Sequence, residues 1–156
     1  MNIEYEYSFK VDCVEKYIQY CENNNYEKKS ENRQIRKLYK NDTDIMGRIT
    51  INYVDGNEII EFDFKNNNQT KNILKESEET IPLIIKNQDL NSIESILKFF
   101  NLKLDKVLDR TRLVYVKKNI KFEIDKYVSP EIMNVIGIEG KKEEVDIIYK
   151  KVINNI

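Results

Sequence analysis

Acidic and basic side chains recur at every second position in several short segments of this chain. Glu4 and Glu6 lie two residues apart, and so do Arg110 and Arg112. In a β-strand, residues i and i+2 point to the same side, so each pair would share one face. Paired carboxylates suit a hard cation such as Mg²⁺ or Mn²⁺, while arginines bind phosphate oxygens. The pattern therefore indicates a site for a phosphorylated compound with a divalent metal.

The absence of histidine narrows the chemistry further. None of the 156 residues is a histidine, which excludes Ser-His-Asp and Cys-His catalysis and the usual zinc sites. Cys13 and Cys21, the two cysteines, lie on one expected helix, which argues against a disulfide framework and for a reducing cytoplasm. The net charge of −1 gives no global field that would favour nucleic acid or a membrane. The length predicts one domain over 1–156, and no apolar run is long enough to span a bilayer.

The hydrophobic periodicity predicts an α+β chain with antiparallel strands. Asp55-Gly56 between two alternating runs is a strong hairpin signal, and the late strands follow one another too closely for parallel crossovers. The segment from 75 to 85 has no clear period, although we expect a strand at its end. Strands are expected at 3–10, 32–40, 47–54, 58–65, 106–117, 121–128 and 133–139, and helices within 11–21, 89–100 and 140–152.

Charged residues gather on one face of these strands, and two arrangements explain this. In the first, the sheet is open and its charged face is solvated, as in a protein-interaction module. In the second, the sheet closes into a barrel and the charges line its interior. The residues concerned are Glu4, Glu6, Lys10, Arg48, Glu61, Asp63, Lys65, Arg110, Arg112, Lys121, Glu123, Asp125 and Glu139.

The order of these motifs resembles the CYTH domain proteins, also called triphosphate tunnel metalloenzymes. That family includes class IV adenylate cyclases, thiamine triphosphatases and tripolyphosphatases. Its opening ExExK strand is similar to IEYEYSF here, and its RxR strand and lysine-bearing partner are similar to GRITI and EFDFK. The later KxR, ExD and ExE strands and the final helix are similar to LDRTRLVY, FEIDKY and VIGIEGKKEEV. The resemblance covers essentially the whole chain.

The resemblance implies a closed eight-stranded antiparallel β-barrel with flanking helices, forming a tunnel. It further implies hydrolysis of a triphosphate-bearing small molecule with Mg²⁺ or Mn²⁺. Carried over residue by residue, it gives metal ligands at Glu4, Glu6, Asp125 and Glu139. It gives phosphate contacts at Arg48, Lys65, Arg110 and Arg112, and Glu123 is a candidate catalytic residue together with Lys10, which no motif of the family matches. Arg36 is a further candidate for phosphate contact, on a strand where the alternation does not settle whether Arg33, Arg36 or Lys37 points inward.

Three positions depart from the family pattern. Ser8 stands at the lysine of ExExK, Thr50 at the second arginine of RxR, and Gly137 at the first acid of ExE. Lys10 shares a face with Ser8 and is our expected substitute for the lost lysine. A second hypothesis follows: a degenerate member that binds a nucleotide or other phosphorylated ligand without turnover.

The resemblance allows several partners. Inorganic tripolyphosphate, thiamine triphosphate, a nucleoside triphosphate and an RNA 5′-triphosphate end all carry the required group. Cyclisation of a nucleotide is less favoured than hydrolysis. We expect no membrane partner and no nucleic acid beyond such an RNA end. A homodimer is compatible with the resemblance, because paired barrels occur among the family.

Overall fold

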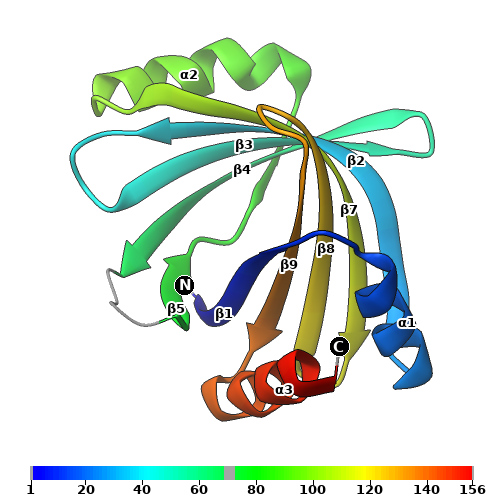
Figure 1. The fold of residues 1–156 in the computed structure, drawn as a ribbon. Coiled ribbons are helices and arrows are strands. Elements are labelled where there is room, and N and C mark those ends of the chain that lie inside the picture. Colours follow the sequence, from blue (N-terminus) through cyan, green and yellow to red (C-terminus); the bar gives the residue numbers. More distant parts are fainter. Residues whose placement is uncertain (1, 69–72, 156) are drawn as a thin grey trace.

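The computed structural model describes residues 2–68 and 73–155, and within them nine strands and three α-helices. Figure 1 shows the strands curving around a common interior, with α2 at one end of the molecule and α1 and α3 at the other. The elements are β1 (Asn2–Val11), α1 (Glu15–Asn23), β2 (Glu27–Lys40), β3 (Ile45–Val54), β4 (Asn57–Asn68), β5 (Lys75–Glu79), β6 (Leu83–Ile85), a 3₁₀ turn (Asn87–Asp89), α2 (Leu90–Phe99), β7 (Lys103–Lys117), β8 (Ile120–Ser129), β9 (Met133–Gly140) and α3 (Lys142–Asn155).

The strands form a closed antiparallel barrel. Their order is β3-β2-β7-β8-β9-β1-β5-β4, and β3 pairs again with β4 to complete the ring. β5 joins the two ends, because it pairs with Asn2–Glu6 of β1 on one edge and with Lys65–Asn68 of β4 on the other. β6 lies outside the ring and pairs with β4 alone. The predicted α+β fold with a closed eight-stranded barrel is confirmed.

A tight turn joins β3 and β4 in a hairpin. Val54 and Asn57 face each other across a two-residue turn, in which Asp55 has φ +50° and Gly56 has φ +79°. Positive φ at both central residues is the geometry that an Asp-Gly turn favours, because it matches the twist of the flanking strands. The hairpin predicted from the sequence is therefore present.

The apolar core lies on the outside of the barrel wall, in two parts. In the larger part, α1 and α3 cover the outer faces of β1, β7, β8 and β9. Its side chains are Tyr7, Val14, Cys21, Tyr26, Leu113, Tyr115, Ile120, Phe122, Ile124, Ile136, Ile138, Val145 and Val152. In the smaller part, α2 covers β2, β3 and β4, with Tyr39, Ile49, Ile60, Phe62, Leu97 and Leu102. Because successive side chains of a strand point in opposite directions, the residues between these outward apolar ones point into the barrel.

Two expectations about elements need correction. β2 begins at Glu27 and not at Asn32. Its polar first half pairs with β7, starting with Glu27 opposite Val116, and the pairing continues after a register shift between Lys28 and Ser30. The segment 75–85 holds two short strands, β5 and β6, separated at Pro82, which lacks the backbone N–H needed for a ladder bond. No helix in the described parts of the chain has the length and apolarity needed to cross a bilayer.

The position of the core gives a direct test of this architecture. Ile138 of β9 is fully buried under the helices, and we expect Ile138→Ala to lower the free energy of unfolding by about 2–5 kcal/mol. Ile147 of α3 is 53% exposed, so Ile147→Ala serves as the matched control, with a change below about 0.5 kcal/mol. Urea unfolding of both variants measures the difference, and equal losses would contradict the placement of the core outside the barrel.

Candidate functional site

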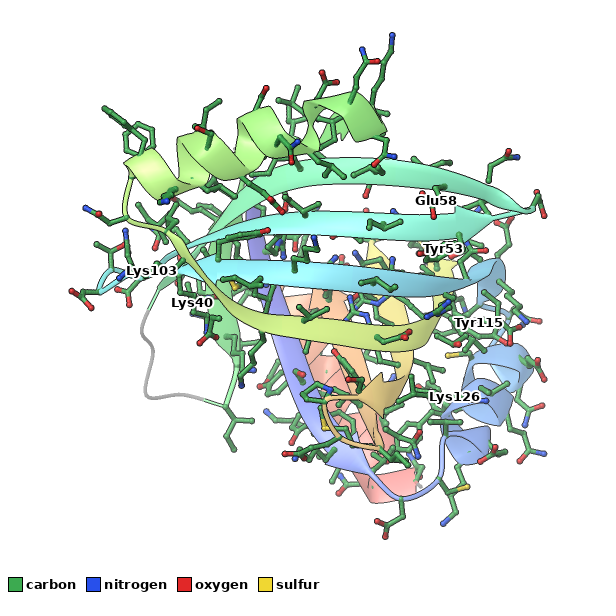
Figure 2. All side chains as sticks on the ribbon, turned by 90° about the horizontal axis from the view of Figure 1, so that it is seen from above. Lys40, Tyr53, Glu58, Lys103, Tyr115 and Lys126 are labelled. Atoms are coloured by element: carbon green, nitrogen blue, oxygen red, sulfur yellow. The ribbon has the colours of Figure 1, made fainter. Side chains whose placement is uncertain are left out.

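A charged cavity of about 330 Å³ occupies the interior of the barrel. Figure 2 shows side chains projecting from both faces of the strands, and those on the inner face line this cavity. Every strand of the ring contributes to the wall. The basic residues are Arg36, Arg48, Lys65, Arg110, Arg112 and Lys121, and the acidic ones are Glu4, Glu6, Glu61, Asp63, Glu79, Glu123, Asp125 and Glu139. The wall thus carries two more acids than bases.

Asp125 joins the two arginines of β7 at the centre of the cavity. Its two oxygens accept hydrogen bonds from Nε and Nη2 of Arg112, both at 2.7 Å, and Oδ2 also accepts from Arg110 Nη1 at 3.1 Å. Arg112 Nη1 also lies 2.5 Å from Glu123 Oε2. Burial lowers the pKa of Arg112, but Glu123 and Asp125 more than offset this and raise it overall. Cross-strand register explains the pairing, since Arg112 and Asp125 face each other on β7 and β8.

Lys121 connects the acids of β8 and β9. Its Nζ lies 3.1 Å from Glu123 Oε1 and 2.5 Å from Glu139 Oε2. Burial raises the pKa of Glu123, yet Arg112 and Lys121 outweigh it and hold that pKa well below the ordinary range. Burial and the nearby Glu123 charge raise the pKa of Glu139 from 4.5 to about 8, against the opposing effect of Lys121. Burial and the neighbouring Glu123 charge thus favour the protonated form of the Glu139 carboxyl group.

A second ion-pair cluster lies on β3, β4 and β5. Arg48 bonds both oxygens of Asp63, with Nε at 2.8 Å from Oδ1, and its Nη1 donates to Glu79 Oε1 at 3.1 Å. Lys65 Nζ lies 3.1 Å from Glu79 Oε1 and 4.0 Å from Glu6 Oε2. Arg48 is only 6% exposed, so these carboxylates supply the counter-charge that a buried guanidinium requires.

Arg36 differs from the other arginines of the wall. Its Nε donates to Thr50 Oγ1 at 3.0 Å, and among the described residues it has no carboxylate at ion-pair distance. Burial, together with the charges of Arg110, Arg112 and Arg48, lowers the pKa of Arg36 to about 9. A guanidinium that is crowded by three others favours an anion beside it.

The position of Arg36 also explains the threonine in the RxR-like segment. Arg36 of β2 and Thr50 of β3 face each other in the ladder, and both line the cavity. An arginine on the neighbouring strand thus lies beside the position where the family pattern has its second arginine. The structure also shows which basic side chains of β2 point inward. Arg36 lines the cavity, whereas Arg33 points outward to Asp109 and Lys37 to Glu94.

Glu4, Glu6 and Glu61 are the least neutralised acids of the wall, and Glu61 accepts a hydrogen bond from the Asn52 amide. Within the described residues no ion pair or hydrogen bond reaches the Glu4 side chain, and Glu6 has only Lys65, at 4.0 Å. Burial, and then the charge of Glu79, raise the pKa of Glu4. A Cβ added to Gly137 would lie 3.1 Å from Glu6 Oε1, so the Glu6 carboxylate occupies the space beside this glycine.

The fit of these acids to a metal ion is partial. No three acidic or thiol groups of the described residues converge closely enough to enclose a metal ion. Asp125 is bound by two arginines and Glu61 accepts a hydrogen bond from Asn52, whereas Glu4 has no hydrogen bond or ion pair within the described residues and Glu6 has one distant lysine, so Glu4 and Glu6 are the most available oxygen donors. This set fits Mg²⁺ or Mn²⁺ in one respect, because Mg²⁺ is commonly held by one or two carboxylates, with water and substrate phosphates completing its coordination.

Most residues expected at the site do line the cavity. They are Glu4, Glu6, Arg36, Arg48, Lys65, Arg110, Arg112, Glu123, Asp125 and Glu139. Lys10 is not brought there: its side chain is 70% exposed and lies 3.9 Å from Glu131. Lys121 and Asp63 belong to the charged face predicted from the sequence but have no predicted role in the site, and Glu79 is missing from that prediction. The alternation of KFEID puts Lys121 on the same face as Glu123 and could have indicated a role for it.

Comparison with known proteins identifies the fold. No protein-family model and no curated protein matches the sequence. The solved structure of the PH1012 protein from Pyrococcus horikoshii OT3 matches with a TM-score of 0.74 and 16% identity, over 97% of this chain and 86% of that one. Two proteins, each described as "a putative adenylate cyclase", also match with a TM-score of 0.65. The one from Bacillus halodurans is 13% identical over 99% of this chain and 90% of its own, and the one from Vibrio parahaemolyticus 10% identical over 97% and 84%.

These identities are low enough that the likeness shows the fold alone. Together with the closed eight-stranded ring, it supports a CYTH-like barrel fold for this chain.

The inward ion pairs can be compared with an outward one of the same type. Asp125 and Asp109 each bind arginine in the structure, but the Arg33–Asp109 pair is exposed on the outer face. We expect Asp125→Asn to destabilise the protein by about 3–5 kcal/mol, because it leaves buried arginines short of a counter-charge. Asp109→Asn should cost less than about 1 kcal/mol. Urea unfolding at neutral pH measures both, and a small effect at Asp125 would mean that the interior is hydrated enough to screen its charges.

Proposed function

We propose that the barrel interior binds a triphosphate-bearing compound together with Mg²⁺ or Mn²⁺ and hydrolyses it. The observation that supports this most directly is Arg36, a cation inside the cavity that has no carboxylate partner in residues 2–68 and 73–155 and lies next to three further arginines. Phosphate oxygens suit such a cluster, because guanidinium groups bind them through charge-assisted and bidentate hydrogen bonds.

The charge balance of the wall supports the metal. The wall has eight acids and six bases, and the acids remain in excess even when Glu139 is protonated, so a polyphosphate entering alone would add anions to an already acidic cavity. Glu4 and Glu6 would hold a divalent cation, and phosphate oxygens would complete its coordination. When bound, the cation would neutralise phosphate charge and position water. Metal and polyphosphate should therefore bind cooperatively, each raising the affinity for the other.

Residues of this chain can supply the remaining functions of hydrolysis. The reaction forms a bond between a water oxygen and the terminal phosphorus and breaks the bond from that phosphorus to the bridging oxygen. Arg36 and Arg112 would bind the phosphate oxygens that gain charge. Glu139, in its ionised form, would accept the proton of the attacking water, and its raised pKa makes it a stronger base than an ordinary carboxylate. The shortened polyphosphate leaves with the electron pair of the broken bond.

Binding without turnover is the second candidate, and one observation favours it. Three arginines of the wall, Arg48, Arg110 and Arg112, already bond carboxylates within the protein. A ligand must compete with these partners, so such arginines are less available to the transition state.

Ligand binding is tested by thermal unfolding with Mg²⁺, tripolyphosphate, or both. At 100 times its dissociation constant a ligand stabilises by about 2.7 kcal/mol, or roughly 5–10 °C for a domain of this size. We expect this shift only when both are present. Arg36→Gln should lose most of it, whereas Arg33→Gln, on the outward face of the same strand, should keep it. Equal shifts in both variants would remove Arg36 from the site, and no shift in the wild type would refute the proposal.

Turnover is tested by phosphate release. The wild type should release phosphate from tripolyphosphate or a nucleoside triphosphate when Mg²⁺ or Mn²⁺ is present. Glu4→Gln/Glu6→Gln should reduce the rate at least a hundredfold, because it removes the two carboxylate charges proposed to hold the cation. The same double change should abolish the cooperative thermal shift. Stabilisation of the wild type without phosphate release would instead establish the binding protein without turnover.

A further inference from the structure

A second, smaller cavity adjoins the charged one and has a different chemical character. It measures about 200 Å³ and shares Glu61 and Arg112 with the wall of the charged cavity. Its other lining residues are neutral: Ser30, Asn32, Gln34, Asn52, Val54, Ile59 and Val114. We call this cavity the amide pocket. It lies beside the β3–β4 hairpin, which Tyr53 and Glu58 mark in Figure 2.

A chain of hydrogen bonds links the amide pocket to the arginines of the charged cavity. Nε and Nη2 of Arg110 both donate to Gln34 Oε1 at 3.1 Å. Gln34 Nε2 donates to Asn52 Oδ1 at 2.7 Å, and Asn52 Nδ2 donates to Glu61 Oε2 at 3.3 Å. An arginine only donates and a carboxylate only accepts, so both amides are held in one orientation. The pocket is thereby prepared before any ligand arrives.

The amide pocket retains hydrogen-bonding capacity after these internal bonds. The NH₂ groups of Gln34 and Asn52 each carry a second N–H, and the amide oxygen of Asn52 has a second lone pair, whereas Gln34 Oε1 already accepts two hydrogen bonds from Arg110. Asn32 retains more, since within the described residues no hydrogen bond involves its side-chain amide. Val54, Ile59 and Val114 supply apolar surface beside these groups. A planar ring with donors and acceptors on its edge matches this combination.

We propose that the amide pocket binds the organic group attached to the triphosphate, and that this group is a neutral nitrogen heterocycle, as in a nucleoside triphosphate. This inference rests on the proposed function, because the shared residue Arg112 fixes the phosphates next to the pocket. The volume of about 200 Å³ limits the group to a small ring system. Inorganic tripolyphosphate leaves the pocket without a ligand and is the weaker ligand.

The test measures dissociation constants by calorimetry with Mg²⁺ for tripolyphosphate and for each of the four ribonucleoside triphosphates. We expect at least one nucleotide to bind ten times more tightly than tripolyphosphate. Asn32→Ala should weaken that nucleotide about tenfold, the effect of losing an amide that reads a ring edge, and leave tripolyphosphate unchanged. Asn32→Ala breaks no hydrogen bond within the described residues, so the variant should fold. Asn67→Ala, at an exposed position of β4, is the control and should match the wild type.

The outcomes separate this inference from the proposed function. If tripolyphosphate binds as tightly as every nucleotide, or if Asn32→Ala weakens both kinds of ligand equally, the amide pocket does not recognise the organic group, although the triphosphate site stands. If no polyphosphate binds with either metal, the proposed function fails and the inference fails with it.

Discussion

The alternation of side chains along each strand determines the architecture of this protein. Because the sheet is closed, every strand residue points either into the barrel or away from it. On β8 the outward residues are Phe122 and Ile124 and the inward ones are Glu123 and Asp125, and the other strands of the wall follow the same division. The helices can cover only the outer face, so both apolar core clusters lie there. Stability and ligand chemistry are consequently assigned to opposite sides of one sheet.

Charged side chains on the inner face are enclosed by the barrel, which carries a desolvation cost. Nearly every basic side chain of the wall is matched to a carboxylate on a neighbouring strand, as Arg112 is to Asp125 and Arg48 is to Asp63. Buried ions paired in this way are tolerated, but they add little net stability beyond avoiding an unpaired charge. Arg36 and Glu4 stand outside this arrangement, since neither has an ion-pair partner in the part of the chain that the structure describes, although both line the same cavity. An arrangement selected for stability alone would have paired or removed both.

The strands and the inward position of most charged residues could be predicted, because alternation is local and does not depend on the partner strand. KFEID and EFDFK show it directly. The sequence could not show which side chains of β2 point inward. Arg33, Arg36 and Lys37 are all basic, and only the register of β2 against β3 and β7 decides which of them points into the barrel. Lys10 has the parity of Glu4 and Glu6, yet it lies near the end of β1, where parity alone does not bring a side chain to the cavity. The amide pocket gave no signal, because asparagine and glutamine are common at exposed positions throughout this chain.

The way in which the ring is closed carries a mechanical consequence. β5 is only five residues long, and it is the sole strand between β1 and β4 in the ring. Local opening of the barrel costs least free energy where the fewest hydrogen bonds must break. We call β5 and its two pairings the seam, and opening is expected there and not between the long strands. Glu79, which holds Arg48 and Lys65, belongs to the same short strand. The seam therefore couples the integrity of the barrel to the charge state of its interior, and a polyanion that drew Arg48 and Lys65 away from Glu79 would loosen the very strand that closes the ring.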